Sequence, residues 1–209
     1  MFSESINLET KRVLEKIGKS AFVSNFYLAG GTALAIQLGH RESIDLDWFS
    51  EKEFANEKIK NELSKIGSFE LNSEEENTVH GAIDNVKVSF LHYPYGRLFP
   101  LVAFEGINLA DERDIAAMKI DAISSRGSKK DFIDLFFLLK KYSLEELLGF
   151  FEKKFKDIRY NKLHILKSLA YFEAAKDEPM PKMIENAGWE EIQKKISEKI
   201  NEFLRRQTT

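Results

Sequence analysis

The chain has 209 residues, contains no cysteine and carries 31 basic against 34 acidic side chains, which gives a formal net charge of −3. The lack of cysteine excludes disulfides, thiolate metal sites and cysteine nucleophiles, and the near-balanced charge provides no global basic field for a nucleic acid. With 43% hydrophobic and 31% charged residues, the composition predicts a folded chain of one or two domains. The polar, acidic start and the short apolar runs predict neither a signal peptide nor a membrane span, so we expect a cytoplasmic protein with no membrane partner.

Short strands and helices alternate over the first 110 residues. The apolar run Phe26–Ala29 stops at Gly30-Gly31, which favours a buried strand. Residues 44–49 alternate apolar and acidic side chains, the two-residue period of a strand, and Asp84-Asn85 suits a hairpin turn. The other elements expected here are helices over 32–38 and 52–66, strands over 69–71, 78–83, 86–93 and 101–104, and a solvated loop at the acidic run 74–76.

The second half of the chain is predicted to be helical almost throughout. We expect helices over residues 111–125, 130–141, 143–155, 161–175 and 189–205. In the last of these, Ile192, Ile196, Ile200 and Phe203 follow helical spacing, which is typical of a helix that packs on a core. The sequence thus predicts an α+β protein: a mixed sheet with helices over residues 1–110, followed by a helical domain over 111–209.

The most informative stretch combines a double glycine with two aspartates. Gly30, Gly31 and Thr32 open a predicted helix after a strand, so that backbone N–H groups, the helix end and a hydroxyl can hold a phosphate. Asp45 and Asp47 follow, and because positions i and i+2 of a strand share a face, their carboxylates should lie side by side. Adjacent carboxylates repel each other unless a cation lies between them. Mg²⁺, or Mn²⁺, suits such oxygen ligands together with substrate phosphates.

The ordered combination resembles the DNA polymerase beta-like nucleotidyltransferase superfamily, whose signature is Gly-Gly/Ser followed by Asp-x-Asp/Glu. The sequence AGGTALAIQLGHRESIDLDWFS (residues 29–50) is similar to one branch of this superfamily, the nucleotidyl transferase AbiEii/AbiGii toxin family. The resemblance implies that Asp45 and Asp47 are catalytic metal ligands, and that Gly30, Gly31 and Thr32 surround the phosphates of an NTP.

A second block supports the same branch. The stretches 114–119 (DIAAMK) and 130–136 (KDFIDLF) are similar to later motifs of the family, which place a lysine on one helix and Asp-x-x-Asp on the next. Lys119 and Asp134 both fall among apolar neighbours, where a charge must be paired or must face a site. One reading is a buried ion pair that only orients two helices. In the other, which the resemblance favours, Lys119 neutralises a nucleotide phosphate and Asp134 holds that lysine or positions the acceptor.

One position departs from the superfamily, which often supplies a third carboxylate from a later strand. Here the strand Val86–Phe90 offers Ser89 instead. Either two strand carboxylates suffice, or Asp131 or Asp134 takes part, or the activity is impaired. Asp131, Arg41 and Ser43 are supporting candidates, and Arg41 lies just before the acidic strand, where it could contact a phosphate.

The histidines and one basic cluster give weaker indications of function. The four histidines fit no zinc spacing and are expected on the surface or satisfied internally: His40, His80, His92 and His164. A basic cluster, Arg126, Lys129 and Lys130, lies between the two motif-bearing helices. It either steers an RNA acceptor or caps helix ends.

The resemblance implies a function as well as a fold. It implies a Mg-dependent transferase that moves a nucleoside monophosphate from an NTP to an acceptor hydroxyl, with tRNA or another RNA as acceptor. It also implies the toxin of a type IV toxin–antitoxin or phage-defence system, with a cognate antitoxin as partner. The alternatives are a degenerate module of the same fold that binds nucleotide or protein, and an enzyme that modifies a small molecule.

Overall fold

The computed structural model describes residues 1–207, which divide into two compact units, residues 1–111 and residues 112 onward. The first unit is built on a seven-stranded sheet with the order β3-β4-β5-β2-β1-β7-β6. Its strands are β1 (Tyr27–Ala29), β2 (Leu46–Ser50), β3 (Phe69–Glu75), β4 (Thr78–Ile83), β5 (Val86–His92), β6 (Val102–Phe104) and β7 (Ile107–Leu109). Its helices are α1 (Leu8–Gly18), α2 (Gly30–Leu38) and α3 (Asn56–Ile66), with short 3-10 turns at Ser3–Ser5 and Ala21–Asn25.

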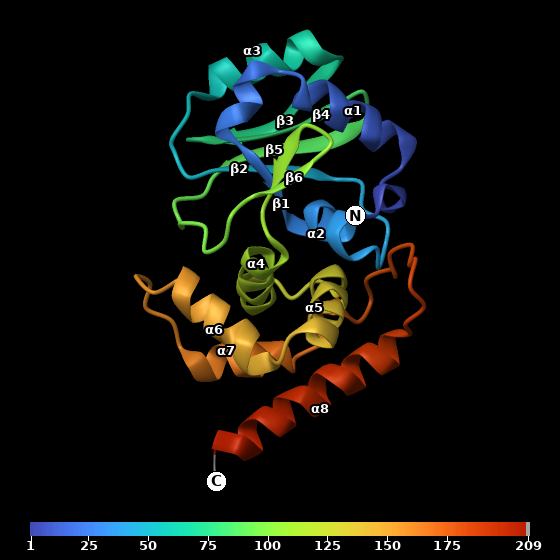
Figure 1. Ribbon diagram of the computed structural model, residues 1–209, viewed down its shortest axis with the longest axis vertical. Coiled ribbons are helices and arrows are strands. Elements are labelled where there is room, and N and C mark those ends of the chain that lie inside the picture. Colours follow the sequence, from blue (N-terminus) through green and yellow to red (C-terminus); the bar gives the residue numbers. More distant parts are fainter. Residues whose placement is uncertain (208–209) are drawn as a thin grey trace. The chain divides into compact units, whose positions relative to one another are not determined.

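The sheet is mixed, as the sequence predicts for an α+β fold. β2 pairs parallel with β5 and antiparallel with β1, and β1 in turn pairs parallel with β7. α1 and α3 lie on one side of the sheet and α2 lies on the other (Figure 1). Side chains on alternate positions of the central strands are fully buried, among them Leu46, Trp48 and Phe90, and the Trp48 and Phe90 rings stack with centroids 6.0 Å apart. The polar positions between them therefore share the opposite face of the sheet.

The second unit is helical. It contains α4 (Glu112–Ser125), α5 (Lys129–Lys141), α6 (Leu144–Lys154), α7 (Lys162–Leu169) and α8 (Trp189–Gln207), with a 3-10 turn at Glu173–Ala175. The apolar stripe predicted along the last helix is confirmed, since Ile192, Ile196, Ile200 and Phe203 are all buried. None of the helices within residues 1–207 has the length and apolar character needed to cross a bilayer.

Several predicted boundaries were wrong. The strand expected over 44–49 begins at Leu46, so Asp45 lies just before it; the Asp45 carbonyl accepts a hydrogen bond from the Thr32 hydroxyl. The helix expected over 52–66 begins at Asn56, and the helix expected over 161–175 ends at Leu169.

The acidic run predicted as a loop belongs largely to a strand. Glu74 and Glu75 pair with β4, and the Glu74 carboxylate contacts the Lys60 ammonium at 3.0 Å. Charged side chains are common on an edge strand. Sequence reasoning also missed α1 and β7. α1 carries a helical apolar stripe that could have revealed it, because Val13, Leu14 and Ile17 are buried. β7 has only three residues, too few for a periodic pattern.

Candidate active site

The double glycine forms the turn between β1 and α2. Gly30 has φ +69°, in the left-handed region that favours glycine. A Cβ atom placed on Gly30 would lie 3.0 Å from Asp47 Oδ2, and one placed on Gly31 would lie 2.6 Å from Arg41 Nη2. The turn therefore has a carboxylate and a guanidinium directly against its backbone, and neither glycine can carry a side chain without moving them.

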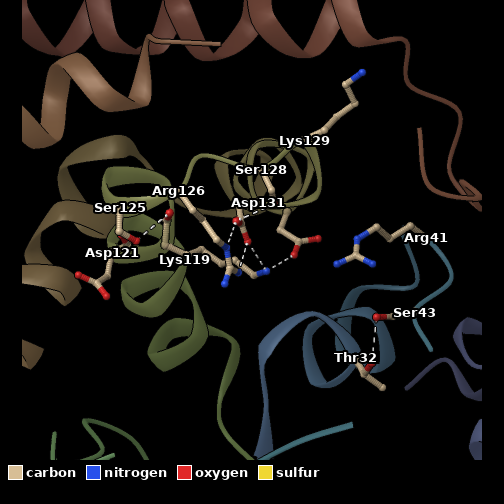
Figure 2. A network of polar contacts seen from close by, with 12 residues as sticks. Thr32, Arg41, Ser43, Lys119, Asp121, Ser125, Arg126, Ser128, Lys129 and Asp131 are labelled. Atoms are coloured by element: carbon tan, nitrogen blue, oxygen red, sulfur yellow. Dashed lines mark hydrogen bonds and ion pairs between the residues drawn. The ribbon is translucent and has the colours of Figure 1, made fainter. Parts of the chain in front are cut away.

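A hydroxyl network connects this turn to the segment before β2. The Thr32 hydroxyl donates to the Asp45 carbonyl, and its oxygen lies 2.8 Å from Ser43 Oγ (Figure 2). Because a hydroxyl has one proton, Thr32 accepts the hydrogen bond from Ser43. Thr32 and Arg41 are both 1% exposed, and Arg41 Nη1 donates to the Glu42 carbonyl at 3.1 Å. Thr32 thus fixes the backbone that carries Asp45, and its contact with a phosphate stays a prediction.

The two aspartates flank a core residue. Asp45 and Asp47 are both half-buried, while Leu46 between them and Trp48 after them are completely buried. This alternation places Asp47, which lies within β2, on the face opposite to the core and next to Gly30, while Asp45 comes just before the strand. Strand register places Ser89 of β5 beside Asp47, at the position where the wider superfamily often has a third acid.

These donors suit a hard divalent cation. Within residues 1–207, no cluster of three or more histidine, aspartate or glutamate side chains forms a metal site. Mg²⁺ is typically held by one or two carboxylates and completes its shell with water and substrate phosphates. A pair of carboxylates beside a helix start fits that chemistry, whereas it does not fit a resident zinc ion.

In the second unit, Lys119 of α4 lies between two carboxylates of α5. Its Nζ is 2.9 Å from Asp131 Oδ1 and 2.6 Å from Asp134 Oδ2. Figure 2 shows Lys119, Arg126 and Ser128 directed at Asp131, which Arg126 Nε contacts at 3.0 Å and Ser128 Oγ at 2.8 Å. The ion pair foreseen between Lys119 and Asp134 is present, but Asp131 shares it.

Asp131 is held in its charged form. Burial by itself would raise the pKa of Asp131, but the charge of Lys119 and the hydrogen bond and charge of Arg126 outweigh burial and bring the pKa to about 2. The four charges of Lys119, Arg126, Asp131 and Asp134 sum to zero, so the cluster is internally neutralised at pH 7.

Two further lysines of this unit are structural, and sequence reasoning missed both roles. Lys154 of α6 pairs with Asp114 of α4 at 2.9 Å, with both side chains 1% exposed. Lys129, predicted as part of a basic cluster between two helices, is buried: its ammonium donates to the carbonyls of Lys176 and Glu178 and lies 5.1 Å from the centroid of the Trp189 ring. Because neither lysine has a periodic signal for its partner, only the tertiary contacts reveal them.

The candidate residues therefore form one group in each unit. The first unit holds the two glycines, the aspartate pair and their neighbours: Gly30, Gly31, Thr32, Arg41, Ser43, Asp45 and Asp47. The second unit holds Lys119, Asp131 and Asp134. One residue on the same face of the sheet as Asp47 was given no role from the sequence. It is His80 of β4, whose Nδ1 lies 3.1 Å from Ser89 Oγ.

Comparison with known proteins indicates the family of the chain. Residues 12–103 match the family model of the nucleotidyl transferase AbiEii toxin of type IV toxin–antitoxin systems. The chain is also 38% identical over 206 residues to an uncharacterized protein of Aquifex aeolicus (strain VF5), covering 94% of this chain and 96% of the relative. The chain belongs to the AbiEii nucleotidyltransferase toxin family.

Solved structures share the fold at low sequence identity. A Helicobacter pylori protein provisionally assigned as a nucleotidyltransferase gives a TM-score of 0.55 at 17% identity, covering 94% of this chain and 92% of its own. MenT4, a nucleotidyltransferase toxin of Mycobacterium tuberculosis H37Rv, gives a TM-score of 0.55 at 15% identity, and the match covers 93% of this chain and 86% of MenT4. As an AbiEii member the chain is a nucleotidyltransferase, and the family implies an NTP substrate and a cognate antitoxin.

Proposed function

We propose that this AbiEii protein transfers a nucleoside monophosphate from an NTP to an acceptor hydroxyl, with tRNA as the acceptor, and releases pyrophosphate. The observation that carries this proposal is that the Asp47 carboxylate lies directly against the Gly30 turn. A Cβ atom placed on Gly30 would be 3.0 Å from Asp47 Oδ2. An anion-binding helix start beside an acidic strand brings phosphate and metal-binding groups to one point.

Each group of the first unit has a role in this proposal. Asp45 and Asp47 would hold Mg²⁺ or Mn²⁺, which supplies charge neutralisation for the in-line displacement. The N–H groups at Gly30 and Gly31 would approach the phosphates of the NTP, because a glycine carries no side chain of its own that covers its backbone. Arg41 adds a guanidinium against Gly31, and Thr32 with Ser43 keeps the Asp45 segment in place.

In the second unit, Lys119 is the proposed phosphate-binding lysine. Asp131 and Asp134 hold its ammonium at 2.9 and 2.6 Å, so they orient the lysine and tie α4 to α5. Because two carboxylates already neutralise its charge, Lys119 would mainly orient the phosphate and would add little net positive charge.

The cellular role proposed is that of a toxin restrained by an antitoxin. MenT4, which shares the fold, is named as a nucleotidyltransferase toxin, and the family model describes type IV toxin–antitoxin systems. Modification of an RNA that translation requires would explain toxicity, and tRNA offers both phosphates and terminal hydroxyls.

The test is labelling with each α-³²P-NTP in the presence of Mg²⁺ and total RNA. We expect one or two NTPs to label an RNA of tRNA size, and Asp47→Asn to abolish the label. Asp157→Asn, an exposed aspartate of the second unit, is the matched control and should label as the wild type does. Label on small molecules alone would favour the small-molecule alternative. NTP binding without transfer to any acceptor would mean a degenerate binding module and would refute the proposal.

A further inference from the structure

A serine and a histidine continue the row of polar side chains that begins at Asp47. Strand register aligns Asp47 of β2 with Ser89 of β5, and Ser89 with His80 of β4. Both Ser89 and His80 are half-buried, at positions that alternate with the buried Val88, Phe90 and Val79. The three side chains therefore lie in a row on the face opposite to the core, and His80 Nδ1 lies 3.1 Å from Ser89 Oγ.

The proposed transfer leaves one chemical task unassigned. The acceptor hydroxyl must lose a proton when its oxygen attacks the α-phosphorus, and a positioned base near pH 7 contributes about 10²–10⁴-fold to such a step. Asp45 and Asp47 serve poorly as that base if they hold a cation, because the cation favours their charged form. Ser89 is the neighbour of Asp47 on the next strand, at the position where the wider superfamily often has a third acid.

We propose that His80, acting through the Ser89 hydroxyl, accepts the proton of the acceptor hydroxyl; this inference rests on the proposed transferase function. The acceptor O–H gives its proton to Ser89 Oγ, and Ser89 gives its own proton to His80 Nδ1, which becomes an imidazolium. The acceptor oxygen forms the new bond to the α-phosphorus of the NTP, and the bond from that phosphorus to the bridging oxygen breaks. Pyrophosphate leaves with that electron pair, and the proton on His80 later passes to solvent.

Strand register identifies the side chains that surround His80. The charged side chains that register places on the same face near His80 are Glu70 and Glu75 of β3 and Lys87 of β5, with Asp47 two strands away. Ser73 of β3 is directly opposite His80, and α2, which packs on β1 and β2, contains no charged residue. Histidine is the side chain that most often acts as a general base in proteins.

The test is the pH dependence of transfer in wild type and variants. We expect wild-type activity to fall on the acid side, because a protonated imidazole cannot accept the proton of the acceptor. His80→Gln keeps a hydrogen-bonding group but takes up no proton, so it should lose about 10²-fold or more in rate together with that acid limb. In the double variant His80→Gln/Ser89→Asp, a carboxylate replaces the base; activity should recover at least tenfold, and the acid limb should move to about pH 4.

The matched control is His92→Gln, because His92 lies on β5 three residues after Ser89, on the opposite face. It should keep the wild-type rate, pH profile and melting temperature, and His80→Gln should keep the melting temperature. Two results would overturn this inference alone: His80→Gln within threefold of wild type, or reduced activity with the acid limb unmoved. If wild type transfers nothing to any acceptor, the proposed function itself has failed.

Discussion

Replacing Lys119 by methionine separates a structural lysine from a phosphate-binding one. The Lys119 ammonium contacts Asp131 at 2.9 Å and Asp134 at 2.6 Å, and the three side chains are 7%, 1% and 0% exposed. Asp131 keeps Arg126 and Ser128 after the change, while Asp134 loses the lysine that holds it. Breaking a buried pair from one side costs about 3–5 kcal/mol. For a chain of this length each kcal/mol corresponds to about 2–4 °C, so the melting temperature should fall by about 6–20 °C.

The double variant Lys119→Met/Asp134→Asn should regain most of this loss. Neutralising both partners of a buried pair is close to neutral in stability, and Asp131 retains Arg126. The chain offers a matched pair of the same chemistry in Lys154 and Asp114, at 2.9 Å with both side chains 1% exposed. Lys154→Met should be destabilised to a similar extent, and Lys154→Met/Asp114→Asn should recover in the same way.

The deciding assay is nucleotide transfer by the two folded double variants, measured well below their melting temperatures. If Lys119 binds phosphate, Lys119→Met/Asp134→Asn stays inactive while Lys154→Met/Asp114→Asn transfers at the wild-type rate. Restored transfer in the Lys119 double variant would remove Lys119 from the catalytic group. A fall of less than about 3 °C for Lys119→Met would contradict the stability reasoning itself.

Three further outcomes are expected. Gly30→Ala should abolish transfer because its Cβ meets the Asp47 carboxylate at 3.0 Å, whereas Gly106→Ala, with a similar positive φ but nothing within 4 Å, should show only the backbone cost of about 1–2 kcal/mol in urea unfolding. Asp45→Asn should leave the melting temperature nearly unchanged without metal, yet it should remove the rise in melting temperature that Mg²⁺ with NTP produces in wild type. A rise equal to that of wild type would exclude Asp45 as a ligand. Because the pKa of Asp131 is lowered to about 2, its contribution of about 2 kcal/mol is present above pH 4 and lost as the pH falls through 2. The difference in free energy of unfolding between wild type and Asp131→Asn should therefore disappear over that pH range, and a constant difference would refute the lowered pKa.

Local patterns in the chain determined much of the fold. The two-residue alternation around Leu46 and Trp48 marked a central strand, and the Asp84-Asn85 turn, where both residues have positive φ, marked the hairpin of β4 and β5. Such signals are readable because strand period and turn conformation depend on neighbours in sequence. The order Gly30-Gly31 and then Asp45 and Asp47 likewise indicated the AbiEii family, because the whole motif lies within one short stretch of the chain.

Only the tertiary structure decided which side chains meet. Asp131 was a supporting residue in the sequence, yet it shares Lys119 with Asp134 and also holds Arg126. Lys129 belonged to a predicted basic cluster and is buried against carbonyls 47 and 49 residues away. The position of His80 beside Ser89 depends on the pairing of three strands, which no local pattern encodes. Contacts between distant segments are fixed by packing and register rather than by periodicity, and the proposed chemistry of this site depends on those contacts.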